Sequence, residues 1–325
     1  MRFQQLGSTG LSVSSISLGT YPLSAAWGGD LDAGQAAVRA ALYEGVNFFD
    51  TAWAYGRAER LFGQAIAGAI ANERESLVLC SKVGLDIEQR PGAKTPFVPN
   101  SRPDFLRQCL TKSLTRMSTE YLDVYLIHWY DPAVPIEDVA GTMGEFVAEG
   151  LVRAVGVSNY SVAQMAQFHA VTQLGVAQVP YSLFSRQVEV DVLPYLSSIG
   201  AGIMGYSALA QGFLTGAFSE TQTFPEGDFR STGVDFQGDR YLERVRAVER
   251  MRVIADDLAC TVAQLALAWV LADSAHVVPI MGAQVPDHVL ASLLAVNVEM
   301  SAPQRNRVTE IANSVPEMDF AALVT

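Results

Sequence analysis

The strongest constraint on the fold of this chain is a regular alternation of strand-like and helix-like segments. Short apolar runs alternate with longer segments in which apolar residues recur at helical spacing. Alternation of this kind predicts a parallel sheet whose strands are connected by helices. Counted from Ser14, the pattern occurs eight times, which predicts closure into a (β/α)8 TIM barrel. The predicted strands cover residues 14–19, 46–50, 77–82, 123–128, 153–158, 176–180, 202–206 and 276–280.

The segments that flank these strands complete the predicted architecture. Residues 2–13 read as an N-terminal β-hairpin around Gly7-Ser8-Thr9-Gly10. Ser161 is expected to be the N-cap of the helix that follows it. No linker or change in composition divides the chain, so residues 1–325 are predicted to form a single domain. The predicted helices cover about residues 32–44, 58–70, 103–117, 136–149, 161–174, 191–199, 241–258, 261–272 and 286–294.

Two loops are longer than compact barrels usually contain. They are Gly84–Arg102, which carries three prolines, and Ser207–Gly238, which is rich in Gly and Phe. Both follow strand ends at the predicted C-terminal rim of the barrel. Loops in that position are usually lids or binding loops, with simple disorder as the alternative.

One glycine motif matches the sequence pattern of a dinucleotide-binding loop, but the predicted elements on either side of it do not fit such a loop. Gly200-Ala201-Gly202-Ile203-Met204-Gly205 fits G-x-G-x-x-G, which has that meaning only after a strand and before a helix. Here a helix-like run precedes the motif and a strand follows it. The glycines are therefore predicted to form a helix C-cap and a tight turn.

Composition and charge limit the partners of the chain. A net charge of −12 disfavours nucleic acid and anionic membranes. The N-terminus has no apolar signal-peptide core, and the most apolar helix-like stretch, Val262–Ala272, is too short to span a bilayer. These features predict a cytoplasmic protein without a membrane partner. They do not determine an oligomeric state.

Neither a metal site nor a nucleophilic serine is expected. Cys80, Cys109 and Cys260 are widely spaced and read as small buried residues in a reducing cytosol. The four histidines are dispersed and lack metal-ligand spacing. There is also no G-x-S-x-G motif.

A small set of ionisable residues follows three successive predicted strands. Asp50 ends one strand, Lys82 ends the next and His128 ends the third, while Tyr55 lies on the loop after Asp50. The carboxyl ends of barrel strands meet at one rim, so these four side chains are expected to lie together. A phenol has a reference pKa of about 10 and becomes a useful proton donor near a cation that stabilises the phenolate.

At these residues the chain resembles the aldo-keto reductase superfamily. The matching motifs span most of the chain in the order found in that family. They are Gly45-Val46-Asn47-Phe48-Phe49-Asp50-Thr51-Ala52, Tyr55-Gly56, Ser81-Lys82-Val83-Gly84, His128-Trp129-Tyr130-Asp131, Gly156-Val157-Ser158-Asn159 and Tyr206-Ser207-Ala208-Leu209.

The resemblance implies a catalytic role for each of the four residues. Tyr55 would protonate the carbonyl oxygen, and Lys82 would lower the pKa of Tyr55. Asp50 would pair with Lys82, and His128 would orient the carbonyl. No side chain supplies hydride, so a nicotinamide coenzyme, NAD(P)(H), is implied.

The resemblance also implies binding residues. Ser158, Asn159 and Gln178 would contact the nicotinamide carboxamide, and Tyr206 would stack on the ring. A helix N-cap is the alternative for the Ser158–Asn159 pair. Tyr21, Trp53 and Trp129 could form an aromatic substrate wall, although Trp53 could equally cap the core. Further coenzyme contacts are expected at Gly19, Thr20, Ser207, Leu209, Gly212, Gly282, Gln284, Asp287 and His288.

The coenzyme segment departs from the family pattern. Most relatives place Lys or Arg just after the position of Gly282, where it binds the 2′-phosphate of NADPH. The segment Gly282–Ser292 contains no Lys or Arg here, and Asp287 adds negative charge. This favours NAD(H) or dual use, unless Arg230 or Arg240 folds over to supply the charge.

These observations predict an oxidoreductase that interconverts small carbonyl compounds and alcohols. One alternative is a sugar or alcohol dehydrogenase that works mainly in the oxidative direction. Another is a coenzyme-binding regulatory subunit with little turnover.

Overall fold

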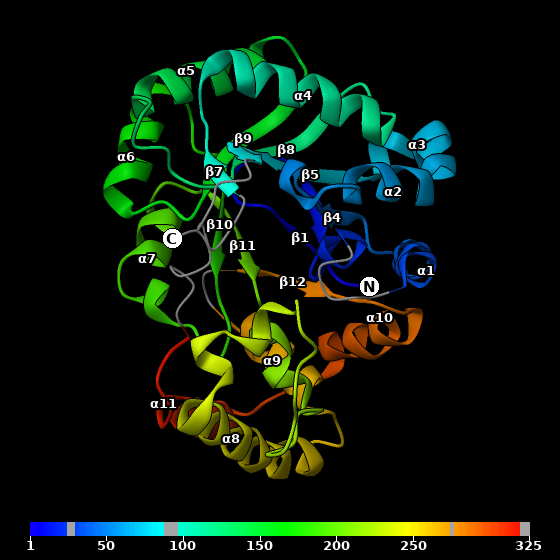
Figure 1. Cartoon of the computed structure of the whole chain (residues 1–325), viewed down its shortest axis with the longest axis vertical. Coiled ribbons are helices and arrows are strands. Elements are labelled where there is room, and N and C mark those ends of the chain that lie inside the picture. The colour runs from blue at the N-terminus through cyan, green and yellow to red at the C-terminus, as the bar shows by residue number, and fades with distance from the viewer. Residues whose placement is uncertain (25–29, 88–96, 274–275, 319–325) are drawn as a thin grey trace.

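The computed structural model describes residues 1–24, 30–87, 97–273 and 276–318. Its centre is a closed barrel of eight parallel strands surrounded by helices (Figure 1), which confirms the predicted fold. Around the ring the strands are β3 (Ser17–Gly19), β4 (Phe48–Asp50), β5 (Val78–Val83), β8 (Leu122–Ile127), β9 (Val152–Ser158), β10 (Val176–Pro180), β11 (Gly202–Tyr206) and β12 (Val278–Gly282).

The strands form where the sequence is continuously apolar. Every residue of β5 and β8 is buried, as expected for parallel strands covered on both faces. Polar residues within such strands, Lys82 and Asp123 among them, therefore need partners inside the protein. The helices that cover the barrel are α1 (Leu31–Tyr43), α2 (Ala58–Ala65), α3 (Ala67–Glu73), α4 (Pro103–Met117), α5 (Ile136–Ala148), α6 (Val162–Val171), α7 (Val192–Ser198), α8 (Gly238–Asp257), α9 (Val262–Leu271), α10 (Pro286–Leu293) and α11 (Ala302–Asn313).

Two helical regions differ from the sequence prediction. The helix expected over residues 58–70 is divided into α2 and α3 at Ile66, whose φ of −111° and ψ of 13° are not helical. Ile66 keeps its side chain buried, so the apolar periodicity continues through the break and hides it. Helix α11 was not expected, although Ser301 and Gln304 form a capping box that marks its start. The predicted N-cap at Ser161 is confirmed, with Gln164 completing a capping box.

The N-terminal hairpin closes the end of the barrel at which the strands begin. Strands β1 (Phe3–Gln5) and β2 (Ser12–Ser14) pair antiparallel, as predicted. Leu6, Leu11 and Val13 join the cluster of side chains inside the barrel. The hairpin approaches β11 so closely that a Cβ on Gly7 would lie 2.3 Å from the backbone nitrogen of Gly202.

This approach explains the glycine motif at residues 200–205. Gly200, with φ +69°, ends the turn after α7, and Gly202 begins β11. A Cβ on Gly202 would also lie 2.6 Å from Leu6. The prediction of a turn rather than a dinucleotide loop is confirmed, and the missing side chains make room for the hairpin.

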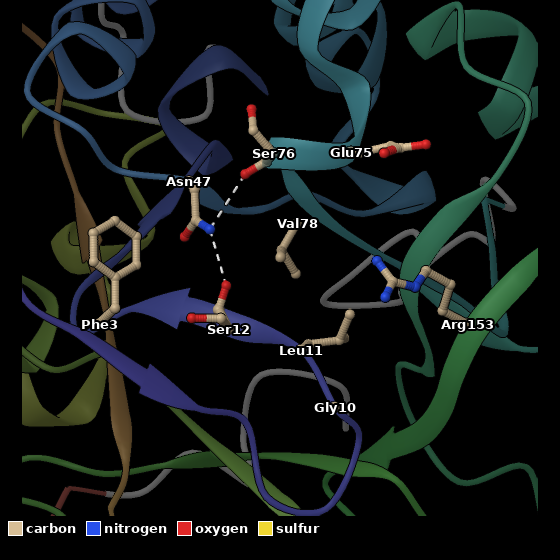
Figure 2. A pocket seen from close by; sticks show the side chains of 9 residues that line it. All are labelled: Phe3, Gly10, Leu11, Ser12, Asn47, Glu75, Ser76, Val78 and Arg153. Carbon is tan, nitrogen blue, oxygen red and sulfur yellow. Dashed lines mark hydrogen bonds between the residues drawn. The ribbon is translucent and has the colours of Figure 1, made fainter.

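A cavity of about 290 Å³ lies between the hairpin and the barrel (Figure 2). Its lining includes Val78, the first residue of β5, so it opens at the N-terminal end of the barrel. The Asn47 side chain lines one side of it and donates to the carbonyls of Ser12 at 2.9 Å and Ser76 at 3.3 Å. These bonds tie the hairpin to the strands, and the cavity lies at the opposite end from Asp50.

The two long loops have different structures. In the first, β6 (Leu85–Ile87) and β7 (Phe97–Pro99) form a short antiparallel pair, and residues 88–96 lie outside the described residues. The second is ordered around a cluster of rings, with Phe213 stacked on Phe236 at 4.8 Å between centroids. Phe218, Phe224 and Tyr241 complete this cluster, so disorder is not the explanation for its length.

Within the described residues, no single helix is both long and apolar enough to cross a membrane; α8 and α9 meet that criterion only as a pair bent by 83°. All three cysteines are free thiols. Cys80 and Cys109 are buried as expected, whereas Cys260 is only partly buried, so that expectation is wrong for Cys260.

Candidate active site

The structure brings the four predicted catalytic side chains together at the C-terminal rim. Asp50 is the last residue of β4, Lys82 lies in β5, and His128 directly follows β8. Tyr55 ends a short 3-10 helix, Trp53–Tyr55, that follows β4. Lys82 Nζ lies 5.0 Å from the centroid of the Tyr55 ring. The centroids of the His128 and Tyr55 rings lie 5.8 Å apart.

A buried ion pair forms the base of this cluster. Lys82 Nζ donates to Asp50 Oδ2 at 2.7 Å and to the Thr51 carbonyl at 2.8 Å. The Lys82 side chain is fully buried. Burial disfavours the ammonium, but the Asp50 carboxylate outweighs it and raises the pKa of Lys82. Lys82 is therefore a fixed positive charge beneath Tyr55.

The balance of effects on Tyr55 differs from the sequence expectation. Removal from solvent raises the pKa of Tyr55 to about 12, while Lys82 acts to lower it. The phenol is therefore held in its protonated form. Lys82 acts in the expected direction, but burial, which the sequence could not quantify, is the larger effect.

His128 is neutral for two reasons that act together. Burial and the nearby Lys82 charge both lower its pKa well below the ordinary value. Its Nδ1 is buried and has no hydrogen-bond partner among the described residues. A neutral imidazole beside a phenol can orient a carbonyl oxygen without adding charge.

The residues expected to hold the nicotinamide form a connected network. Asn159 Nδ2 donates to the His128 carbonyl and to Ser158 Oγ, both at 3.0 Å. The Tyr206 hydroxyl donates to Asn159 Oδ1 at 2.8 Å. Gln178 instead directs its amide nitrogen at Asp50 Oδ1, 2.8 Å away. Hydrogen bonds thus join the residues predicted to contact the ring and the carboxamide to the catalytic cluster.

The fit of a coenzyme can be judged from the polar groups at the rim. Gly282 of β12 pairs with Gly19 of β3, and Gly19 pairs with Asp50 of β4, so these residues lie at one level. The hydroxyl of Thr20 is buried beside them with no partner among the described residues. Together with Nδ1 of His128, it leaves hydrogen-bonding capacity that a bound coenzyme would use.

The outer part of the predicted coenzyme site lies around the start of α10. Asp287 and His288 are exposed in its first turn, and the Gln284 N–H donates to His288 Nδ1 at 3.5 Å. Leu209 precedes a 3-10 helix, Ala210–Thr215, and Gly212 lies within it. The same element contains the left-handed residues Ala210 and Gln211. Ser207, with φ +54°, precedes this turn.

The three predicted substrate aromatics occupy different environments. The Tyr21 ring meets the Tyr55 ring edge-on at 4.9 Å between centroids. Trp129 follows His128 at the rim and is partly exposed. The Trp53 ring instead packs against α4, with the Arg116 guanidinium 4.0 Å from its centroid. This contact favours the core-capping role for Trp53 over a substrate role.

One residue near the cluster was not identified from the sequence. Asp228 is buried in the second long loop, and its charge contributes to raising the pKa of Tyr21, after burial itself. Asp228 also pairs with Arg230 at 2.6 Å. No motif marks Asp228, because only the folding of the loop over the rim brings it near Tyr21.

Comparison with known proteins identifies the family. The family model described as the aldo/keto reductase family matches residues 15–313. The chain belongs to the aldo-keto reductase family. It is accordingly an NAD(P)(H)-dependent oxidoreductase, in a class that acts on small carbonyl and alcohol compounds.

Three similar proteins show the breadth of this family. The chain is 35% identical to the aldo-keto reductase YhdN of Bacillus subtilis (strain 168), over 90% of this chain and 87% of that protein. It is 29% identical to an NADH-specific methylglyoxal reductase of Escherichia coli (strain K12), over 95% of this chain and 98% of that protein. The solved structure of the glycerol dehydrogenase AKR11B4 of Gluconobacter oxydans superposes with a TM-score of 0.87 at 31% identity, covering 98% of this chain and 97% of that one.

Proposed function

We propose that this aldo-keto reductase reduces small aldehydes or ketones with NADH, using Tyr55 as the proton donor. The observation that carries the proposal is the position of Tyr55. Its ring lies 5.0 Å from the buried Lys82 ammonium and beside a neutral His128. The bound coenzyme supplies hydride to the carbonyl carbon.

The side chains then have distinct tasks. Tyr55 donates its proton as negative charge develops on the substrate oxygen. Lys82 stabilises the phenolate that remains, and Asp50 keeps Lys82 in place through their 2.7 Å contact. His128 directs an N–H at the oxygen. Donors fixed before reaction stabilise a developing charge most effectively. Tyr21 and Trp129 shield the carbonyl from water.

The preference for NADH rests on charge at the adenosine end. Asp287 is exposed in the first turn of α10, where a 2′-phosphate would meet like charge. The two arginines that could supply a cation are already engaged. Arg230 pairs with Asp228 at 2.6 Å, and Arg240 pairs with Asp235 at 3.2 Å. The NADH-specific E. coli relative is consistent with this preference.

A second candidate is oxidation of polyols, which the similarity to a glycerol dehydrogenase favours. The same residues serve this direction, with Tyr55 accepting the proton. The location is proposed to be the cytoplasm, where three free thiols are stable. We treat residues 1–325 as one functional unit.

Coenzyme turnover tests these proposals together. Aldehydes, ketones, aldoses and pyridoxal are offered with NADH and NADPH, and polyols with NAD and NADP. Reduction of carbonyls with NADH is the expected result. Tight coenzyme binding without turnover on any compound would instead favour the regulatory-subunit alternative.

A further inference from the structure

The side chain of Gln178 crosses the inside of the barrel to reach Asp50. Gln178 lies in the middle of β10 and Asp50 at the end of β4, and these strands stand four places apart in the eight-strand ring. Both residues are 3% exposed, and Gln178 Nε2 lies 2.8 Å from Asp50 Oδ1. The contact therefore spans the barrel directly beneath the catalytic cluster.

The chemistry of the two groups determines how Gln178 is oriented. An ionised carboxylate only accepts hydrogen bonds, so the amide nitrogen must face Asp50. The amide oxygen then points away from Asp50, and it accepts no hydrogen bond from the described residues. Met204 Sδ, 3.8 Å from Nε2, is the other polar neighbour of the amide nitrogen.

Asp50 is consequently held at both oxygens. Lys82 binds Oδ2 at 2.7 Å, and Gln178 binds Oδ1 at 2.8 Å. Rotation of the carboxylate would break both contacts at once. Because Asp50 positions Lys82, the hydrogen bond from Gln178 to Asp50 Oδ1 also fixes the distance from the Lys82 ammonium to the Tyr55 ring.

The geometry points to Gln178 as a positioning residue that links nicotinamide binding to the charge beneath Tyr55. This inference rests on the proposed function. The free amide oxygen of Gln178 receives the carboxamide of the coenzyme, while its amide nitrogen holds Asp50. The link runs from Gln178 through Asp50 and Lys82 to Tyr55. Gln178 thus does more than bind the carboxamide.

Two variants of Gln178 separate these roles. Gln178→Met keeps the length of the side chain but cannot donate to Asp50. At saturating coenzyme its kcat should fall by about tenfold, a modest share of a general-acid effect. In an Asp50→Asn background, Gln178→Met should lower kcat by less than about threefold, because Gln178 and Asp50 act as a unit.

Gln178→Glu gives a readout that a purely structural role would not produce. Two ionised carboxylates at this separation would repel each other, which raises the pKa of one of them, so the pair keeps a proton at low pH. That proton restores a donor between the two side chains. The kcat of Gln178→Glu should therefore recover towards wild type at low pH and fall as the shared proton is lost. Gln178→Met should show no such recovery.

Controls make the outcome decisive. Gln264, a buried glutamine whose amide donates to the Ala291 carbonyl at 2.8 Å, is changed to Met as the matched variant. Gln264→Met should lose stability but keep kcat. If Gln178→Met keeps kcat and only weakens coenzyme binding, or if its effect adds fully to that of Asp50→Asn, the inference is overturned.

A second cycle is independent of turnover. The free energy of unfolding of the coenzyme-free protein is measured for wild type, Gln178→Met, Asp50→Asn and the double variant. Non-additive losses support the contact, and additive losses contradict it. Absence of turnover in the wild type would refute the proposed function, while this cycle would still decide whether Gln178 holds Asp50.

Discussion

The Lys82 ammonium lies 2.7 Å from the Asp50 carboxylate, and solvent does not reach the lysine side chain. Both charges of this buried pair have lost their contact with water, and the attraction between them compensates for that loss. The pair also supports the Tyr55 ring, 5.0 Å from Lys82 Nζ. Its disruption should therefore affect stability and chemistry together.

Lys82→Met should destabilise the protein by about 3–5 kcal/mol, because it leaves Asp50 buried without a counter-charge. Lys82→Met combined with Asp50→Asn should be more stable than Lys82→Met alone, since the orphaned charge is removed. Denaturant unfolding of the two variants measures the difference. Equal stabilities would show that the pair is not coupled as the distance implies.

The pH dependence of stability should report His128. Burial and Lys82 lower the pKa of His128 in the folded protein, whereas the unfolded chain titrates near about 6.5. As pH falls below that value, the unfolded chain binds a proton that the folded protein does not, so stability decreases. His128→Gln should lose less stability than wild type between about pH 7 and about pH 5.

The exposed His288 gives the matched control for removal of a histidine side chain. His288→Gln should retain the wild-type pH dependence of the unfolding midpoint. An unchanged pH dependence in His128→Gln would mean that His128 is not the group held neutral.

Much of the fold could be predicted because it depends on local patterns. The eight strand–helix repeats and the N-terminal hairpin are all present. The break at Ile66 could not be predicted, because the buried side chain preserves the helical periodicity. The contact of Trp53 with Arg116 depends on how the segment after β4 packs against α4, which is a tertiary property.

The candidate site shows the same division. The sequence was sufficient to place three side chains at one rim, those of Asp50, Lys82 and His128. Once the parallel strands are predicted, the positions of their carboxyl ends follow. The hydrogen bond from Gln178 to Asp50 joins residues 128 positions apart across the barrel, and no spacing rule encodes it. The size of the burial effect on Tyr55 likewise needed the packed structure.

Coenzyme preference should respond to charge at α10. His288→Arg would supply a cation near the adenosine end and should raise kcat/KM for NADPH by at least about tenfold, because charge-assisted bonds to phosphate are about twice as strong as neutral ones. The value for NADH should change little. Wild type is expected to prefer NADH in the same assay. A tenfold wild-type preference for NADPH, worth about 1.4 kcal/mol, would show that a cation elsewhere binds the phosphate.

The second long loop should depend on Arg244. This arginine is fully buried, pairs with Asp235 at 2.8 Å and donates to the Pro316 carbonyl at 2.9 Å. Arg244→Met should cost about 3–5 kcal/mol and weaken coenzyme binding, because the loop loses its attachment to the C-terminal segment. Arg246 lies on the same helix as Arg244 and makes an exposed pair with Glu220, so Arg246→Met is the matched control. It should unfold like wild type, and equal losses in both variants would refute a special role for Arg244.

The central claim is that Tyr55 delivers the proton during carbonyl reduction. Its most direct test is a single-turnover measurement, in which protein saturated with NADH is mixed with a carbonyl compound that the wild type reduces. Tyr55→Phe should bind NADH with the wild-type dissociation constant and oxidise it at least about 100-fold more slowly, the scale expected for loss of a general acid. A Tyr55→Phe variant that oxidises bound NADH at the wild-type rate would contradict the claim.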